Sequence, residues 1–195
     1  MNTDYYSNIT FGAKFNSIAK VRMIKPTGKS YKKADVSFVK FDKTNERDMF
    51  VLSECAKNWN DDEFAKSVYL SAQSIASDCE SRITSEIYML TTQDKDFDKL
   101  KAENILGLAD VTLLGSDKRI LLEHLKVNPF IKNDKSAQIK GVGTALLDSL
   151  KSMYTRIILI SIDKDSVKDF YRRNSFIEYP EGTNLFTWFS ELKIF

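Results

Sequence analysis

Residues 119–162 carry the feature that most restricts the fold of this chain: two apolar strands joined through a glycine-bearing turn and one amphipathic helix. The first strand ends before Pro129, which cannot donate a backbone hydrogen bond and holds Asn128 in extended geometry. The second strand, RIILISI at 156–162, is almost continuously apolar, which is typical of strands buried on both faces. A strand–helix–strand unit of this kind pairs in parallel, which predicts an α/β fold.

The turn before the helix contains Gly141 and Gly143, two of only seven glycines in the chain. Glycine reaches positive φ and has no Cβ, so a ligand can approach its backbone closely. The helix that follows presents unpaired N–H groups and the positive end of its dipole at its N-terminus. The turn is therefore a candidate anion-binding site, or a bend that only shapes the connection.

The remaining periodicity predicts a mixed sheet flanked by helices. Strands are expected at 35–41, 85–92, 104–114, 175–179 and 184–195, and helices at 45–59, 61–79 and 165–174. Consecutive strands should pair as antiparallel hairpins. A chain of 195 residues without repeats or linkers fits a single domain spanning 1–195. The Lys-rich residues 1–34 are expected to be a basic N-terminal extension, with 20–24 as a short edge strand.

Composition argues against several classes of protein. The formal net charge is only +2, although the first forty residues hold eight Lys and Arg against two acidic residues, so a nucleic-acid partner is not indicated. Cys55 and Cys79 form no C-x-x-C pair and His124 is the only histidine, which argues against a metal site or a disulfide framework. No apolar run or leader signal predicts membrane insertion or export, so cytoplasmic localisation is expected.

Two stretches resemble the GNAT superfamily of N-acyltransferases. LEHLKVNP followed by QIKGVGTALLDSL is similar to the family's acyl-CoA-binding motif, in which a strand precedes a Q/R-x-x-G-x-G/A turn, here on Gln138, Gly141 and Gly143. DFYRRNSF resembles the later helix-to-strand segment, where an aromatic pair precedes a turn and a Phe. Two positions depart from the pattern: Lys164 stands where Asn is common, and Ser175 stands where Gly is usual.

The resemblance implies a mixed, mostly antiparallel sheet flanked by helices, with a splayed central strand pair that forms an acyl-CoA cleft. Acetyl-CoA would be the acyl donor, and no metal is implied. The residues implied to bind it lie in three places: Leu125, Lys126 and Val127 on the first strand, Gln138, Ile139, Lys140, Gly141, Val142, Gly143 and Thr144 around the turn, and Phe170 in the second motif.

Tyr171 and Glu123 are the catalytic candidates that the resemblance implies. Tyr171 aligns with a tyrosine that donates a proton to the departing CoA thiolate, although an aromatic on a helix is otherwise a core residue. Glu123 matches a position where many members carry a base that deprotonates the amine; the alternative is a solvated or salt-bridged strand residue. By strand alternation, His124 should point to the opposite face from Glu123.

The acidic run Asp61, Asp62 and Glu63 precedes a predicted helix and lies where the family's acceptor side is walled. These residues would either attract a cationic amine or cap the helix. The implied reaction is acetyl transfer from acetyl-CoA to a primary amine of a small molecule or a protein, by direct attack in a ternary complex. The alternative is a catalytically silent acyl-CoA-binding module. A monomer or homodimer without a membrane partner is expected.

Overall fold

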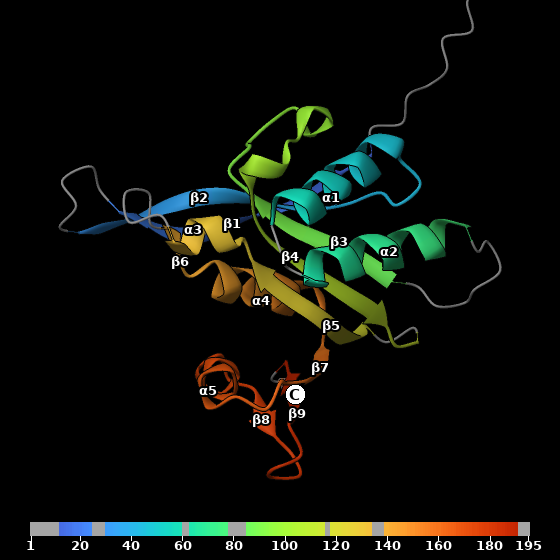
Figure 1. Ribbon diagram of the computed structural model, residues 1–195. Coiled ribbons are helices and arrows are strands. Elements are labelled where there is room, and N and C mark those ends of the chain that lie inside the picture. Colours follow the sequence, from blue (N-terminus) through green and yellow to red (C-terminus); the bar gives the residue numbers. More distant parts are fainter. Residues whose placement is uncertain are drawn as a thin grey trace, which may run out of the picture.

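The computed structural model describes residues 12–24, 30–59, 63–77, 85–115, 118–133 and 139–190. These residues form one nine-stranded sheet in the order β6-β1-β2-β3-β4-β5-β7-β9-β8 (Figure 1). The strands are β1 (Lys14–Ile24), β2 (Tyr31–Lys40), β3 (Ser85–Thr91), β4 (Ile105–Leu113), β5 (Arg119–Val127), β6 (Ile139–Lys140), β7 (Arg156–Ile160), β8 (Ile177–Glu178) and β9 (Leu185–Phe189). The helices are α1 (Glu46–Asn58), α2 (Glu63–Ser77), α3 (Pro129–Asn133), α4 (Val142–Met153) and α5 (Asp165–Arg173), with 3₁₀ turns η1 (Phe97–Lys99) and η2 (Ala102–Asn104).

The strand directions match the expected mixed, mostly antiparallel sheet. Neighbouring strands from β1 to β5 pair antiparallel, and so do β7 with β9 and β9 with β8. Among the strands that the structure describes, only β5 and β7 pair in parallel, with α4 in the crossover between them. The strand–turn–helix–strand unit predicted from residues 119–162 is therefore confirmed.

Two apolar clusters hold the helices to opposite faces of the sheet. α1 and α2 cover one face, where Val39, Ile87 and Leu108 pack beneath them (Figure 1). α4 covers the other face through Leu146 and Leu150, in a cluster that also takes in residues of α5 and β9. The two faces therefore belong to different helices, and a ligand reaching the sheet from one side meets different side chains from one reaching it from the other.

The N-terminal part of the sheet departs from the expectation. Residues 14–24 form one long strand, β1, which pairs with β2 along its length and with β6 at Arg22 and Met23, so it is an interior strand rather than a short edge strand. Its buried positions are the small Ala19 and Val21, which alternate with charged residues and produce little apolar signal. The two-residue β6 and the five-residue α3 were not expected, because neither is long enough to show periodicity.

The expectation that residues 156–162 are buried on both faces is wrong. Ile157 and Leu159 are buried, but Ile160 and Ile162 are 74% and 66% exposed. The α1–α2 layer packs on β2, β3 and β4, and β7 lies beyond β5 in the sheet order. β7 therefore lies beyond the part of the sheet that α1 and α2 cover, and its face on that side stays exposed to solvent. Within the described ranges, no helix has the length and apolar character needed to cross a bilayer.

Candidate active site

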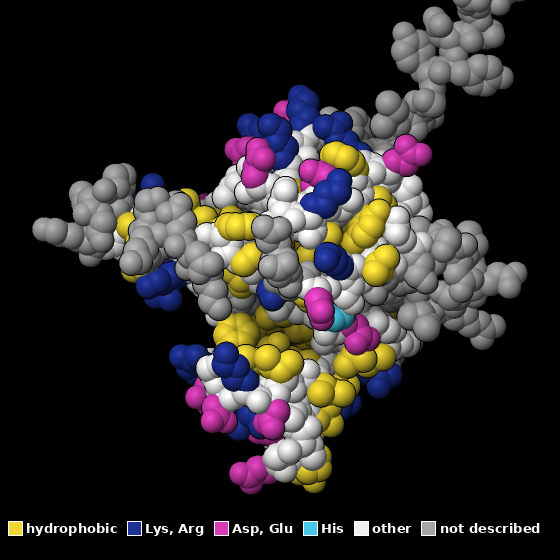
Figure 2. Space-filling view, viewed as in Figure 1, with side chains coloured by type: hydrophobic (Ala, Val, Ile, Leu, Met, Phe, Trp, Pro, Cys, Tyr) yellow, Lys and Arg dark blue, Asp and Glu magenta, His cyan; other side chains and the backbone are white. Residues whose placement is uncertain are grey.

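The strands β5 and β7 separate at the centre of the sheet. They pair only from Arg119 with Arg156 to Leu121 with Ile158, whereas β5 continues to Val127 in register with β4. The β7-facing edge of β5 after Leu121 therefore has no strand beside it. Figure 2 shows a hollow lined by hydrophobic side chains between the main body and the part that carries α5. This is the splayed strand pair that the resemblance implied.

Backbone groups of β5 face into this splay. The N–H of Asn128 donates to the Leu106 carbonyl on the β4 side (2.9 Å). Because backbone groups alternate between the two edges of a strand, the N–H of Val127 points the other way, toward β7. The side chains of Leu125 and Val127 pack on the α4 cluster. Lys126 instead extends to the α2 face, where its Nζ lies 5.8 Å from the centre of the Phe64 ring.

The turn before α4 has the conformation that glycine favours. Gly141 has φ +84°, and a Cβ built on it would meet nothing within 4 Å, so the space beside it is open. The first hydrogen bond within the helix runs from the Ala145 N–H to the Gly141 carbonyl (2.8 Å). The N–H groups of Val142, Gly143 and Thr144 precede it and are not used by the helix. These donors, at the positive end of the α4 dipole, suit the pyrophosphate of CoA.

Gly143 is also a point of close packing. It is buried and has an ordinary helical conformation, and a Cβ there would lie 3.1 Å from Phe170 Cζ and 3.7 Å from Val127 Cγ2. The absent side chain lets the Phe170 ring of α5 approach the first turn of α4. Gly143, Val127 and Phe170 thus meet at one point, although they come from three different elements.

Of the other residues expected around the turn, two are described and one is not. Ile139 and Lys140 form β6, and Lys140 Nζ lies 4.7 Å from the centre of the Tyr31 ring of β2. Gln138 lies outside the described residues. The structure therefore describes the turn from Ile139 onward.

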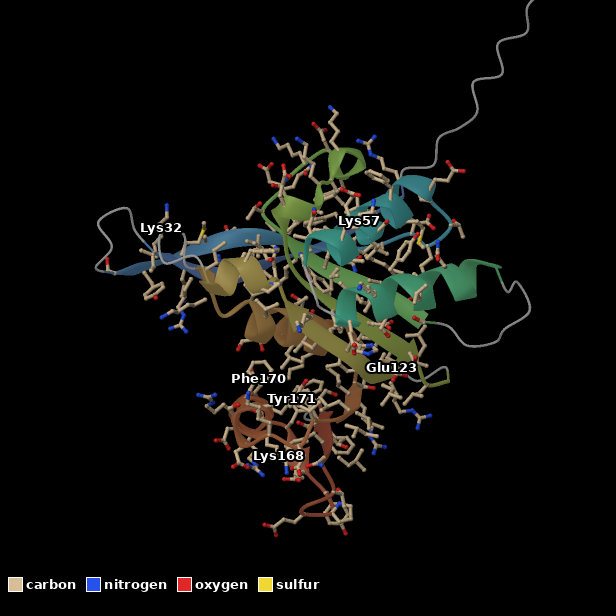
Figure 3. All side chains as sticks on the ribbon, viewed as in Figure 1. Lys32, Lys57, Glu123, Lys168, Phe170 and Tyr171 are labelled. Atoms are coloured by element: carbon tan, nitrogen blue, oxygen red, sulfur yellow. The ribbon has the colours of Figure 1, made fainter. Side chains whose placement is uncertain are left out.

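Tyr171 lies on the same side of the sheet as the turn. Figure 3 shows Phe170 and Tyr171 extending from α5 toward the hollow below α4 and β5. The Tyr171 ring packs against Phe170, Phe176 and Phe186 at centroid separations of 5.2, 5.7 and 5.8 Å. Burial raises the pKa of the Tyr171 phenol to about 12, so the hydroxyl keeps its proton at neutral pH. A protonated hydroxyl can act as a hydrogen-bond donor or an acid.

Glu123 sits at a β-bulge, where two residues of β5 oppose a single position of β4. His124 pairs with Asp110 and Leu122 pairs with Val111, which leaves Glu123 as the extra residue. Its Oε1 accepts a hydrogen bond from Thr112 Oγ1 (3.0 Å), and the side chain is exposed. The bulge places this carboxylate on the α1–α2 side of the sheet, whereas Tyr171 belongs to the cluster on the α4 side. Both residues are labelled in Figure 3.

His124 does not point to the opposite face from Glu123, so that expectation is wrong. His124 Nδ1 lies 3.6 Å from Asp110 Oδ2, whereas Glu123 binds Thr112. Asp110 and Thr112 are two residues apart on β4 and therefore share a face. The bulge breaks the alternation and brings both side chains to the α2 side. Figure 2 shows His124 with acidic side chains on both sides of it.

The start of α2 lies against this part of β5. The Phe64 ring packs edge-on against His124 at 5.0 Å. Glu63, the residue before it, is exposed at the first position of the helix. Asp61 and Asp62 lie outside the described residues. Of the three acidic residues, the structure therefore places only Glu63, on the same side of the sheet as Glu123.

Both departures from the family pattern fall at places with special backbone geometry. Ser175 has φ +62°, in the left-handed region that glycine occupies without cost. Lys164 is the N-cap of α5, and its side chain makes no capping hydrogen bond, which an Asn side chain would make. The local fold is therefore retained with residues that suit it less well.

The described residues offer neither a metal cluster nor a reactive thiol. No group of three or more His, Cys, Asp or Glu side chains within them could hold a metal ion. Cys55 is buried in α1, and burial raises the pKa of its thiol to about 12, which suppresses the nucleophilic thiolate. Cys79 is outside the described residues.

Comparison with known proteins supports the fold at the level of structure. Neither the family models searched nor the curated proteins searched match this sequence. A protein of the GNAT acetyltransferase family from Desulfovibrio desulfuricans matches with a TM-score of 0.52 and 14% identity, over 79% of this chain and 98% of its own. PaiA N-acetyltransferase from Thermoplasma acidophilum, solved with coenzyme A, matches with a TM-score of 0.47 and 17% identity (80% and 99% covered). Tetrahymena GCN5 matches with a TM-score of 0.46 and 12% identity (87% and 94% covered). Together with the splayed β5–β7 pair and the glycine turn before α4, the first of these matches shows that this chain has the fold of the GNAT acetyltransferases.

Proposed function

We propose that this protein transfers an acetyl group from acetyl-CoA to a primary amine by direct attack in a ternary complex. The observation that carries the proposal is the meeting of Val127, Gly143 and Phe170 at the mouth of the β5–β7 splay. There the unused N–H groups of α4, the cleft-facing edge of β5 and the phenol of Tyr171 lie around one hollow.

The donor side of the reaction falls to residues on the α4 face. Acetyl-CoA, when bound, supplies the acetyl group and leaves as the thiol. The N–H groups of Val142, Gly143 and Thr144 would hold its pyrophosphate. The N–H of Val127 would stabilise the negative charge that develops on the thioester oxygen. Tyr171 would donate its proton to the departing sulfur and regain a proton from solvent.

The acceptor side falls to the α1–α2 face. An amine is mostly protonated at neutral pH and must lose a proton before its nitrogen attacks. Glu123 would accept that proton, directly or through water, because its carboxylate is exposed on this face. The splay lets the amine and the thioester meet through the sheet. The buried thiol of Cys55 favours direct attack over an acyl-enzyme route.

Two measurements test the proposal together. Acetyl-CoA at a hundredfold its dissociation constant should stabilise the protein by about 2.7 kcal/mol, which corresponds to an unfolding midpoint raised by about 5–10 °C. Free-thiol release should then appear with at least one member of a panel of primary amines. A shift without thiol release from any amine would favour the silent binding module, and no shift with acetyl-CoA or CoA would refute both.

The acidic residues at the start of α2 suggest the kind of amine. We propose that Asp61, Asp62 and Glu63 attract positive charge to the acceptor side, so the preferred acceptor carries a second cation. Changing the three to Asn, Asn and Gln should raise the KM for a diamine and weaken its salt dependence, because exposed charges are screened over about 8–10 Å at physiological ionic strength. Acetyl-CoA affinity should not change. If the KM values for charged and neutral amines stay in the same ratio while stability falls, these residues only cap the helix.

A further inference from the structure

A second pocket lies at the opposite end of α4 from the glycine turn. It encloses about 680 Å³ and is lined by the start of β1, the end of β2, the start of β3, the β4–β5 connection and the end of α4. α4 has twelve residues, so the pocket lies roughly 18 Å from the Gly141 turn along the helix. It therefore takes no part in the acetyl-transfer site.

Four basic residues line this pocket: Lys14, Lys40, Lys118 and Arg119. Lys14 and Lys40 are directly opposite one another in the β1–β2 ladder. Two like charges in that arrangement destabilise a sheet unless something compensates them. Lys14 and Lys118 are both exposed, and neither has an ion-pair partner within the described part of the chain.

Glu86 is the one acidic residue among the described lining residues, and its carboxylate is already bound by other lining side chains. Lys40 bonds to Oε1, while the hydroxyls of Tyr88 and Tyr154 both donate to Oε2, the latter at 2.9 Å. Burial would raise the pKa of Glu86, but these hydrogen bonds outweigh it and lower the pKa, so the group stays ionised. Glu86 and Lys40 cancel one another.

Among the described lining residues, two positive charges therefore remain that no described carboxylate offsets, those of Lys14 and Lys118. Together they exceed the negative end of the α4 dipole, which is worth about half an elementary charge. Tyr88 and Tyr154, which are 1% and 8% exposed, also line it. The volume lies within the range of about 300–1,000 Å³ that holds small molecules.

We propose that this pocket binds a small polyanion of the phosphate-bearing class, held at its rim by Lys14 and Lys118. The ammonium groups would form charge-assisted hydrogen bonds with phosphate oxygens. The pocket volume of about 680 Å³ favours a small molecule over a nucleic-acid chain. The proposal is independent of the acetyl-transfer reaction, because it uses neither the glycine turn nor the β5–β7 splay.

Titration calorimetry of the full chain with inorganic tripolyphosphate at low ionic strength tests the site. The double variant Lys14→Gln/Lys118→Gln should bind at least about tenfold more weakly, since each lost bond to a charged group is worth roughly a factor of ten or more. Lys66→Gln/Lys99→Gln is the matched control, because it removes the same charge from exposed residues outside the pocket. Its affinity should stay within about twofold of the unmodified protein, as expected for well-separated charges in salt.

Several outcomes would overturn the proposal. One is that the unmodified protein does not bind tripolyphosphate. Another is that both double variants lose affinity to the same extent, because an equal loss would indicate an effect of net charge alone. Undiminished binding by Lys14→Gln/Lys118→Gln would place the anion elsewhere, and loss on Gly141→Val would assign it to the α4 turn. Tighter binding of a single-stranded oligonucleotide through the same two lysines would replace the small molecule with a nucleic acid. Equal unfolding midpoints of the two double variants would show that the comparison is between folded proteins.

Discussion

The substitution Tyr171→Phe separates catalysis from packing at the proposed site. It removes one hydroxyl and keeps the ring, so the contacts with Phe170, Phe176 and Phe186 remain. Among the described residues, no hydrogen bond to this hydroxyl is formed. Removing a hydroxyl that forms no hydrogen bond within the protein is close to neutral for stability. The unfolding free energy should therefore stay within about 0.5 kcal/mol of the unmodified protein.

Turnover should respond quite differently. General acid help is worth about 10²- to 10⁴-fold, so kcat should fall by a factor in this range while the Kd for acetyl-CoA hardly moves. Burial raises the pKa of the phenol to about 12, and folding therefore favours the neutral form. That contribution to stability is fully present below the ordinary pKa near 10 and is lost as the pH rises through 12. Between about pH 6 and 9 the acid is available throughout, and Tyr171 should cause no alkaline loss of rate.

The assay is free-thiol release at saturating acetyl-CoA and acceptor, with the Kd measured by calorimetry on the same preparations. Tyr179→Phe is the control, because it makes the same chemical change at a side chain that is 77% exposed. An unchanged kcat with an unchanged Kd would show that Tyr171 is only a core aromatic residue. A loss of stability as large as the loss of rate would show that the hydroxyl has a structural bond.

Four further substitutions test other parts of the structure. Glu123→Gln should lower kcat by a factor that shrinks as pH rises and the amine loses its proton unaided, so a pH-independent loss would point to positioning instead. Ser175→Gly should raise the unfolding free energy by about 0.5–1 kcal/mol, because glycine adopts the positive φ without strain. Lys164→Asn should raise it by about 0.5–2 kcal/mol, because an Asn side chain can cap α5. Both gains are measured by denaturant unfolding, and no gain would mean that neighbouring residues already compensate. Tyr154→Phe should cost about 1–3 kcal/mol, because it removes the hydrogen bond that the Tyr154 hydroxyl donates to the half-buried, charged Glu86 carboxylate, and a neutral result would refute that network.

The order of helices and strands could be predicted from the sequence because each element carries a local signal. Apolar spacing marks α1, α2 and α4, and Asn45 accepts the N–H groups of Arg47 and Asp48 where α1 begins. The parallel β5–β7 pair follows from the helix between the two strands. The glycine turn could also be predicted, because the positive φ at position 141 favours glycine over other residues.

Tertiary structure alone decided how these elements make a site. The bulge at Glu123 arises from the pairing of β5 with β4, and it reverses the face expected for His124. Gly143 lacks a side chain because Phe170, from another helix, packs there. The cluster of Glu86, Tyr88 and Tyr154 joins residues far apart in the chain. Periodicity reports only the neighbours within a strand or helix, whereas bulges, close approaches and pockets depend on which elements come to lie against one another.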